Sequence, residues 1–182
     1  MSSKLNVCEI ISGHIATLRD SSTNKLSIAD VFTFFVIPIL FSILSIICFF
    51  DLTNDLISLL VNFGAIFTAL LLSVLVLVYD QSSKLTERNQ LSPVAFFDVK
   101  KLLLKQLYYN ICYSIILSVN LVVFCFIESI ARGFIINIHY PYILKLNLDR
   151  YLIVPIIIFI AIHLILNIIM IVKRMHALLT TE

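Results

Sequence analysis

Four stretches of mostly apolar residues, none containing a charge, alternate with polar segments along the chain. They cover residues 31–50, 56–79, 106–127 and 151–172, and none contains Asp, Glu, Lys or Arg. A helix rises ~1.5 Å per residue, so about 20 apolar residues are enough to cross the ~30 Å hydrocarbon core of a bilayer. The pattern therefore predicts an all-α fold, a four-transmembrane-helix bundle.

The segments between these stretches are short. They are an N-terminal segment, residues 1–30, a connection at 51–55, loops at 80–105 and 128–150, and a tail at 173–182. None is long enough to bury a hydrophobic core of its own. The sequence therefore excludes a separate soluble enzyme domain.

Composition supports a membrane protein. Hydrophobic residues make up 60% of the chain and charged residues 13%, with a mean hydropathy of +1.05. Soluble domains are close to half apolar and a quarter charged. The net charge of +2 is too small for a surface that binds polyanions, so we expect no direct contact with nucleic acid.

The basic residues predict the orientation. Segments 1–30, 80–105 and 173–182 hold three, five and two Lys and Arg, against three in segment 128–150 and none in 51–55. By the positive-inside rule, both termini of a multi-pass membrane protein face the cytoplasm. Loop 128–150 is then extracytoplasmic.

Residues 5–20 have the pattern of an amphipathic helix. Its apolar face carries Cys8, Ile11, Ile15 and Leu18, and the opposite face carries Glu9, Gly13, Thr17 and Asp20. Sparse basic charge makes it a poor ligand for anionic lipid. Two docking sites are possible for this helix. One is a groove on a partner or neighbouring subunit, contacted by Ile11, Ile15 and Leu18, and the other is the end of its own bundle.

Loop 80–105 carries helical extensions of the flanking spans. Ser92 and Pro93 predict a helix that begins around Val94, because Ser suits an N-cap and Pro the first helical position. Three lysines follow on this helix: Lys100, Lys101 and Lys105. They suit membrane lipid phosphates or, alternatively, an acidic protein surface.

Two further local features concern backbone geometry. Pro38 and Pro155 lie inside predicted spans, where we expect kinks or local openings because proline has no N–H to donate. In loop 128–150, apolar and polar residues alternate on both sides of Pro141. That alternation permits a small hairpin.

Uncharged polar and small residues in the spans predict helix packing. Asn and His in hydrocarbon form hydrogen bonds between helices, and small residues four apart let helices approach closely. The candidate packing residues are Asn62, Gly64, Ala65, Ala69, Ser73, Asn120, His163 and Asn167. A second interpretation makes His163 a pH-sensitive or pore-lining residue.

The sequence contains no pattern typical of an enzyme site. It has no nucleotide-binding glycine loop, no HExxH, no Cys or His metal spacing and no nucleophile elbow. We therefore expect no enzyme activity, no catalytic residue, no cofactor and no metal. The uncharged spans also lack a carboxylate for proton or ion coupling, which disfavours an ion-coupled transporter.

Two functions fit this pattern. The first is an oligomeric sensor or anchor subunit that presents its cytoplasmic helices to a soluble partner protein. The second is a pore-forming or membrane-permeabilising protein, in which several copies line a channel with residues such as Asn62, Asn120 or His163. A solute transporter is a weaker third, because the chain has no clear internal repeat.

Three segments also carry a family resemblance. They are Gly13 to Asp20 (GHIATLRD), Lys25 to Asp30 (KLSIAD) and Val76 to Gln81 (VLVYDQ). With them, the chain resembles the KwaA family, the small four-helix membrane subunits of the Kiwa anti-phage defence system. The resemblance implies an inner-membrane homo-oligomer, for instance a tetramer, that detects infection and works with a cytoplasmic, DNA-binding effector of the KwaB type.

Overall fold

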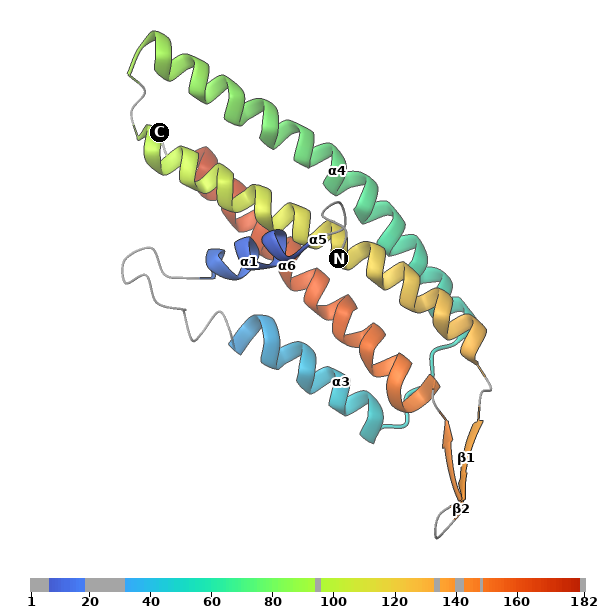
Figure 1. Cartoon of the computed structure of the whole chain (residues 1–182). Helices are drawn as coiled ribbons and strands as arrows, with labels where there is room; N and C mark the ends of the chain where they lie inside the picture. The colour runs from blue at the N-terminus through green and yellow to red at the C-terminus, as the bar shows by residue number, and fades with distance from the viewer. Residues whose placement is uncertain are drawn as a thin grey trace.

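The computed structural model describes residues 7–18, 32–93, 96–132 and 149–180, and the backbone of 135–139 and 143–147. Three long helices dominate it: α4 (Asn54–Leu91), α5 (Phe97–Ala131) and α6 (Val154–Thr180). Two shorter helices, α1 (Cys8–Thr17) and α3 (Ile37–Ile47), pack on them (Figure 1). The described part of the chain is therefore predominantly helical, as the sequence predicts.

The length and hydropathy of the helices fit a membrane protein. Asn54–Leu91, Phe97–Ala131 and Asp149–Thr180 are each long and apolar enough to cross a bilayer. The fourth apolar helix, Phe32–Ile47, is shorter, and at ~1.5 Å per residue it measures about 24 Å. The described residues thus form three helices long enough to cross a membrane and one shorter apolar helix, where the sequence predicts four spans of 20 to 24 residues.

Helix α3 ends early because its C-terminus is closed by a tight backbone turn. Phe49 has a positive φ of 50°, and the Phe50 N–H donates to the Ser45 carbonyl at 3.0 Å. This six-to-one hydrogen bond beside a left-handed residue is the pattern that ends many helices, although glycine is more usual at that position. Residues 48–50 therefore leave the helix although they are as apolar as those before them.

Both prolines in the apolar stretches follow a short π-helical turn. The turn η2 (Phe32–Val36) comes just before Pro38, and η3 (Asp149–Ile153) comes just before Pro155. Proline cannot donate an i→i−4 hydrogen bond, so the preceding turn is free to widen. The Ser42 hydroxyl donates to the Pro155 carbonyl at 2.9 Å and thereby ties α3 to α6.

The helices form a row. Helix α5 packs between α4 and α6, α6 packs between α5 and α3, and α1 lies on α5 (Figure 1). The main core fills the space between α5 and α6, where Leu121, Ile157 and Leu164 are fully buried. The outer faces of α3 and α4 expose many large apolar side chains, as expected of helices surrounded by lipid.

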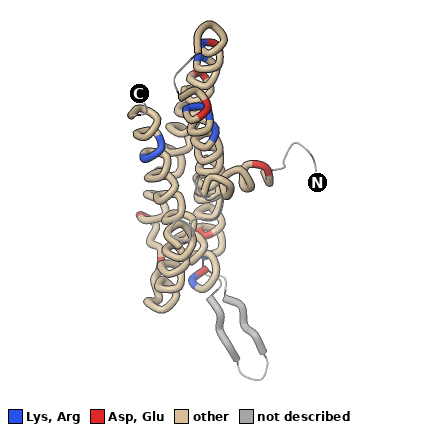
Figure 2. Tube along the Cα trace, turned by 90° about the vertical axis from the view of Figure 1, so that its left-hand side faces the viewer, with Lys and Arg blue, Asp and Glu red and all other residues tan. Residues whose placement is uncertain are grey.

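The two ends of the bundle, where the long helices start and stop, differ. At one end, here called the turn end, α4 stops, α5 begins and α6 stops (Figure 1). At the other, the hairpin end, strands β1 (Ile135–His139) and β2 (Ile143–Asn147) pair antiparallel. Lys, Arg, Asp and Glu gather toward these ends, and most of the bundle between them is free of charge (Figure 2).

Helix α4 extends well past its apolar stretch at the turn end. It continues for twelve residues beyond Tyr79, or ~18 Å. Ser92 caps this helix at its C-terminus, with its N–H donating to the Arg88 carbonyl at 2.9 Å. The predicted helix start at Val94 lies outside the described residues. Helix α5 begins at Phe97, after Phe96 in a left-handed conformation, so Ser92 and Pro93 are not its N-cap and first helical residue.

Gly64 sets the spacing between α4 and α5. A Cβ at this position would lie 2.8 Å from Val122 Cγ2 and 3.1 Å from the Ser118 carbonyl oxygen. One turn further on, the hydroxyls of Thr68 and Ser118 are 2.7 Å apart. Close approach and a polar contact thus hold the two longest helices together.

We predict that Gly64→Leu destabilises the protein because the larger side chain forces α4 away from Val122 and Ser118. Overpacking of this kind costs ~1–3 kcal/mol. The thermal unfolding midpoint in detergent micelles should fall by several degrees. Ala65→Leu is the control, since Ala65 is exposed on the same helix. Equal midpoints for the two variants would contradict this account of the packing.

Candidate functional site

The most concentrated polar feature of the described structure is a buried group of side chains from α1, α5 and α6. It consists of His14, Thr17, Asn110, Tyr113 and His163, and is called here the two-histidine cluster. His14, Asn110 and His163 are each no more than 1% exposed. Most buried polar groups form hydrogen bonds, and the bonds within this cluster constrain how α1 sits on the bundle. Among the described residues, His14 Nε2 and Asn110 Nδ2 have no hydrogen-bond partner.

On α1, the cluster is held by hydrogen bonds to Asn110. The His14 Nδ1 lies 2.9 Å from the Asn110 Oδ1, which can only accept, so we place the histidine proton on Nδ1. The Thr17 hydroxyl is 2.9 Å from the same oxygen and 2.7 Å from the His14 carbonyl. Two residues one turn apart on α1 thus converge on one amide of α5.

Tyr113 connects the two histidines. Its ring stacks on the His14 imidazole, with centroids 3.9 Å apart, and its hydroxyl lies 3.0 Å from the His163 Nε2. The His163 Nδ1 is 2.8 Å from the Phe34 carbonyl and must donate to it. Tyr113 therefore donates to the neutral imidazole of His163, and the cluster reaches from α1 to the π turn that precedes α3.

The approach of α1 depends on Gly13. A Cβ here would lie 2.3 to 2.7 Å from ring atoms of Tyr109, so only glycine allows this separation. At the C-terminus of α1, the Arg174 guanidinium donates to the Thr17 carbonyl at 2.7 Å. A cation at this position also interacts favourably with the helix dipole.

Burial lowers the pKa of His14 from 6.5 to about 4. The hydrogen bond to Asn110 opposes this shift, and His163 and Arg174 add to it. His14 is therefore neutral at neutral pH. The cluster serves as an uncharged anchor for α1 that protonation would weaken.

The docked face of α1 is not the face that its apolar pattern predicts. Gly13, His14 and Thr17 face the bundle, while Ile11 and Ile15 are 37% and 41% exposed. Leu18 is a correction to the predicted partner-binding face: it is 2% exposed, because it packs against Phe34 and Met170. Only Ile11 and Ile15 of the predicted set on α1 are open to another molecule.

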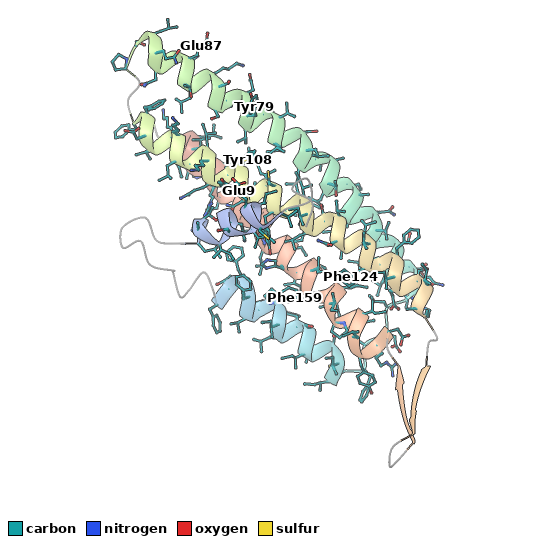
Figure 3. The ribbon with its side chains drawn as sticks, viewed as in Figure 1. Glu9, Tyr79, Glu87, Tyr108, Phe124 and Phe159 are labelled. Atoms are coloured by element: carbon teal, nitrogen blue, oxygen red, sulfur yellow. The ribbon has the colours of Figure 1, made fainter. Side chains whose placement is uncertain are left out.

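The three candidate lysines on α5 divide between two surfaces. Lys105 lines a pocket of about 400 Å³ with Glu9 and Tyr109, between α1 and α5 (Figure 3). Lys105 and Lys101 also line a second pocket, toward α4. Lys100 faces a different cleft, between α4, α5 and α6. The structure therefore brings Lys101 and Lys105 together and separates Lys100 from them.

The candidate packing residues also divide. Gly64, His163 and Asn167 are buried within the chain, and the Asn167 amide donates to the His163 carbonyl at 2.7 Å. The remainder are exposed on the outer sides of α4 and α5: Asn62, Ala65, Ala69, Ser73 and Asn120. The small-residue face of α4 is therefore uncovered within one chain, apart from Gly64.

At the hairpin end, an ion-pair group ties the chain connections to the helix ends. Arg150 Nε lies 2.7 Å from the Asp51 carboxylate, which holds the pKa of Asp51 below its usual value. Arg132 donates to the Leu52 carbonyl at 2.8 Å and lies 3.7 Å from Glu128. These contacts fix the short 51–55 connection against α5 and η3.

The described residues include no group of three or more His, Cys, Asp or Glu side chains that could hold a metal ion. Comparison of the chain with known protein families, curated proteins and solved structures finds no match. The arguments about function therefore rest on the geometry of this chain.

We predict that acidification releases α1. Because the pKa of His14 is lower when docked, its contribution is complete above pH 6.5 and is lost as the pH falls from 6.5 toward 4. At pH 5 the loss is ~2 kcal/mol, or about thirtyfold in the docking equilibrium. Hydrogen exchange of the α1 amides, corrected for intrinsic rates, should show that loss of protection between pH 7.5 and 5.

Two variants control this measurement. His14→Gln cannot titrate and should make α1 protection independent of pH, whereas His176→Gln, on the exposed part of α6, should behave as the parent chain. Unchanged protection of the parent α1 at pH 5 would contradict the anchoring role of neutral His14.

Proposed function

We propose that this chain is a sensor or anchor subunit of the bacterial inner membrane that recruits and regulates a soluble cytoplasmic effector. The observation that carries the proposal is the docking of α1 by its polar face. This arrangement leaves Ile11 and Ile15 exposed, while Lys101 and Lys105 of α5 lie on a separate surface of the chain. An exposed apolar pair and exposed lysines suit a partner protein whose surface is partly apolar and partly acidic.

The turn end provides the room for such a partner. Helix α4 continues to Leu91 and α5 starts at Phe97, so both extend past the apolar stretches. Lys101 is exposed and its ammonium lies 5.4 Å from the centre of the Phe97 ring. With the termini inside, as the basic residues predict, this end faces the cytoplasm.

Self-association is the second part of the proposal. Ala65, Ala69 and Ser73 form an uncovered small-residue face on α4, and such faces support close helix contacts in membranes. Asn62 and Asn120 are also exposed, and an amide in hydrocarbon gains from a partner across a helix contact. We propose a homo-oligomer built on this side of α4 and α5.

The KwaA resemblance agrees with this function and adds the biological setting. In that setting, the subunit acts in anti-phage defence and the effector is of the KwaB type. The proposal assigns no enzyme activity, cofactor or nucleic-acid contact to this chain itself.

The test is co-purification with the product of the neighbouring gene. We expect the parent chain to co-purify with this protein. The double variants Ile11→Asp/Ile15→Asp and Lys101→Glu/Lys105→Glu should each recover at least tenfold less of it. Lys84→Glu is the control, because Lys84 is exposed on α4 and pairs with Asp80 at 2.7 Å. Full retention by both double variants, with helix content unchanged, would rule out this docking surface.

A pore-forming function is the alternative, and the exposure of Asn62 and Asn120 on long apolar helices favours it. If several copies line a pore with these amides, overexpression without any partner should depolarise cells, and Asn62→Leu/Asn120→Leu should abolish the effect. A membrane potential unaffected by the parent chain, with the protein present in the membrane fraction, would eliminate this alternative.

A further inference from the structure

The turn end carries a cleft that is separate from α1 and from the proposed effector surface. It encloses about 440 Å³ between α4, α5 and α6. Its inner wall is apolar and well packed, with Val78, Leu104 and Leu107 no more than 5% exposed. From the opposite side, Leu178 of α6 lines the same space. This volume and lining are typical of sites that hold apolar ligands.

The cleft also has two cations on one side. Arg88 of α4 and Lys100 of α5 line it together with Gln81. Among the described residues, neither cation has an ion-pair partner. An uncompensated pair of cations from two helices would attract an anionic group.

The neighbouring acids of α4 do not neutralise these cations. Asp80 pairs with Lys84 at 2.7 Å. Glu87 lines a different pocket, with Tyr79 and Gln90 (Figure 3). The cleft therefore combines an apolar interior with positive charge.

The position along the helices fits the edge of a bilayer. Val74 and Leu77 lie within the apolar stretch of α4, which ends at Tyr79, whereas Arg88 lies ~13 Å beyond it. Headgroup regions add roughly 5–7 Å to each side of the hydrocarbon core, and long Arg and Lys side chains reach several ångströms toward it. The apolar wall would thus lie at the level of acyl chains and the cations at the level of phosphates.

We propose that this cleft is a binding site for a single anionic phospholipid, with its phosphate between Arg88 and Lys100 and an acyl chain along Leu77 and Leu179. The anionic headgroup matches the uncompensated charge. The acyl chain covers apolar side chains of the cleft that the helices leave exposed, Leu77 at 60% and Leu179 at 75%. Lys101 and Lys105 do not line the cleft, so lipid binding and effector binding use different cations on the same helix.

Native mass spectrometry of the delipidated full chain in detergent tests this proposal. The probes are dioleoyl phosphatidylglycerol and dioleoyl phosphatidylcholine, which share acyl chains and differ in net charge. We expect one retained phosphatidylglycerol per chain, bound about tenfold more tightly than phosphatidylcholine. Both lipids carry a phosphate, but the choline cation of phosphatidylcholine offsets its attraction to Arg88 and Lys100. Attraction of a net anionic headgroup to two cations, at roughly 1 kcal/mol each, sets an upper limit of about thirtyfold.

Three variants sharpen the test. Arg88→Gln/Lys100→Gln should lose the preference for phosphatidylglycerol, whereas Lys101→Gln/Lys105→Gln, with the same change in charge, should keep it. Val74→Trp fills the apolar part of the cleft and leaves both cations in place, so it should weaken retention of phosphatidylglycerol.

Three outcomes would overturn the proposal: equal binding of the two lipids by the parent chain, a preference that survives in Arg88→Gln/Lys100→Gln, or an equal loss in Lys101→Gln/Lys105→Gln. Displacement of the bound lipid by glycerol phosphate at a similar concentration would show that the acyl chain contributes nothing, and would also overturn it. Effector co-purification by Arg88→Gln/Lys100→Gln separates this result from the proposed function, because that variant should retain the effector.

Discussion

The placement of α1 on the bundle depends on the hydrogen bonds between α1 and Asn110. His14 and Thr17 both use the Asn110 side-chain oxygen, and Gly13 brings them close enough to do so. An isolated ten-residue helix is marginal in water, so α1 is stable mainly through this docking. Because the polar face makes the contact, the apolar face is left for another molecule.

The same contact couples α1 to the rest of the bundle. Tyr113 stacks on His14 and reaches His163, and His163 in turn donates to the Phe34 carbonyl near the start of the shorter apolar helix. A change in the position of η2 or α3 would therefore be transmitted to α1 through His163, Tyr113 and His14, whose side chains are in direct contact. For the sensor function proposed above, this continuity provides a physical route from α3 to α1.

The turn end then divides into two surfaces with different chemistry. One carries Lys101 and Lys105 of α5, and is assigned to the proposed protein partner. The other is the cleft between the long helices, and suits a lipid. The split arises because Lys100 and Lys101 are consecutive on a helix and so point about 100° apart.

The broad outline of this fold could be predicted from the sequence, since long uncharged apolar stretches have few alternatives to membrane helices. The shorter length of α3 could not, because it depends on a left-handed Phe49 where sequence rules expect glycine.

The face of α1 that docks on the bundle also could not be predicted from the apolar pattern. Apolar periodicity groups Ile11, Ile15 and Leu18 on one face, for docking on a partner or on its own bundle, whereas in the structure a buried amide on α5 makes the polar side of α1 the contact with the bundle. Two signals for it were present, Gly13 beside His14 and the pairing of Asn110 with Tyr113 one turn apart on α5. Neither signal predicts this contact unless α1 and α5 are already known to be adjacent.

The state of the His14 imidazole is the most direct test of the central claim that α1 docks by its polar face. Solid-state NMR of ¹⁵N-histidine-labelled protein in lipid bilayers distinguishes protonated from neutral rings, and His14→Gln assigns the signals. The account predicts a neutral His14 with its proton on Nδ1 at pH 6, below its ordinary pKa of 6.5. A His14 signal that is mostly imidazolium at pH 6 would contradict it.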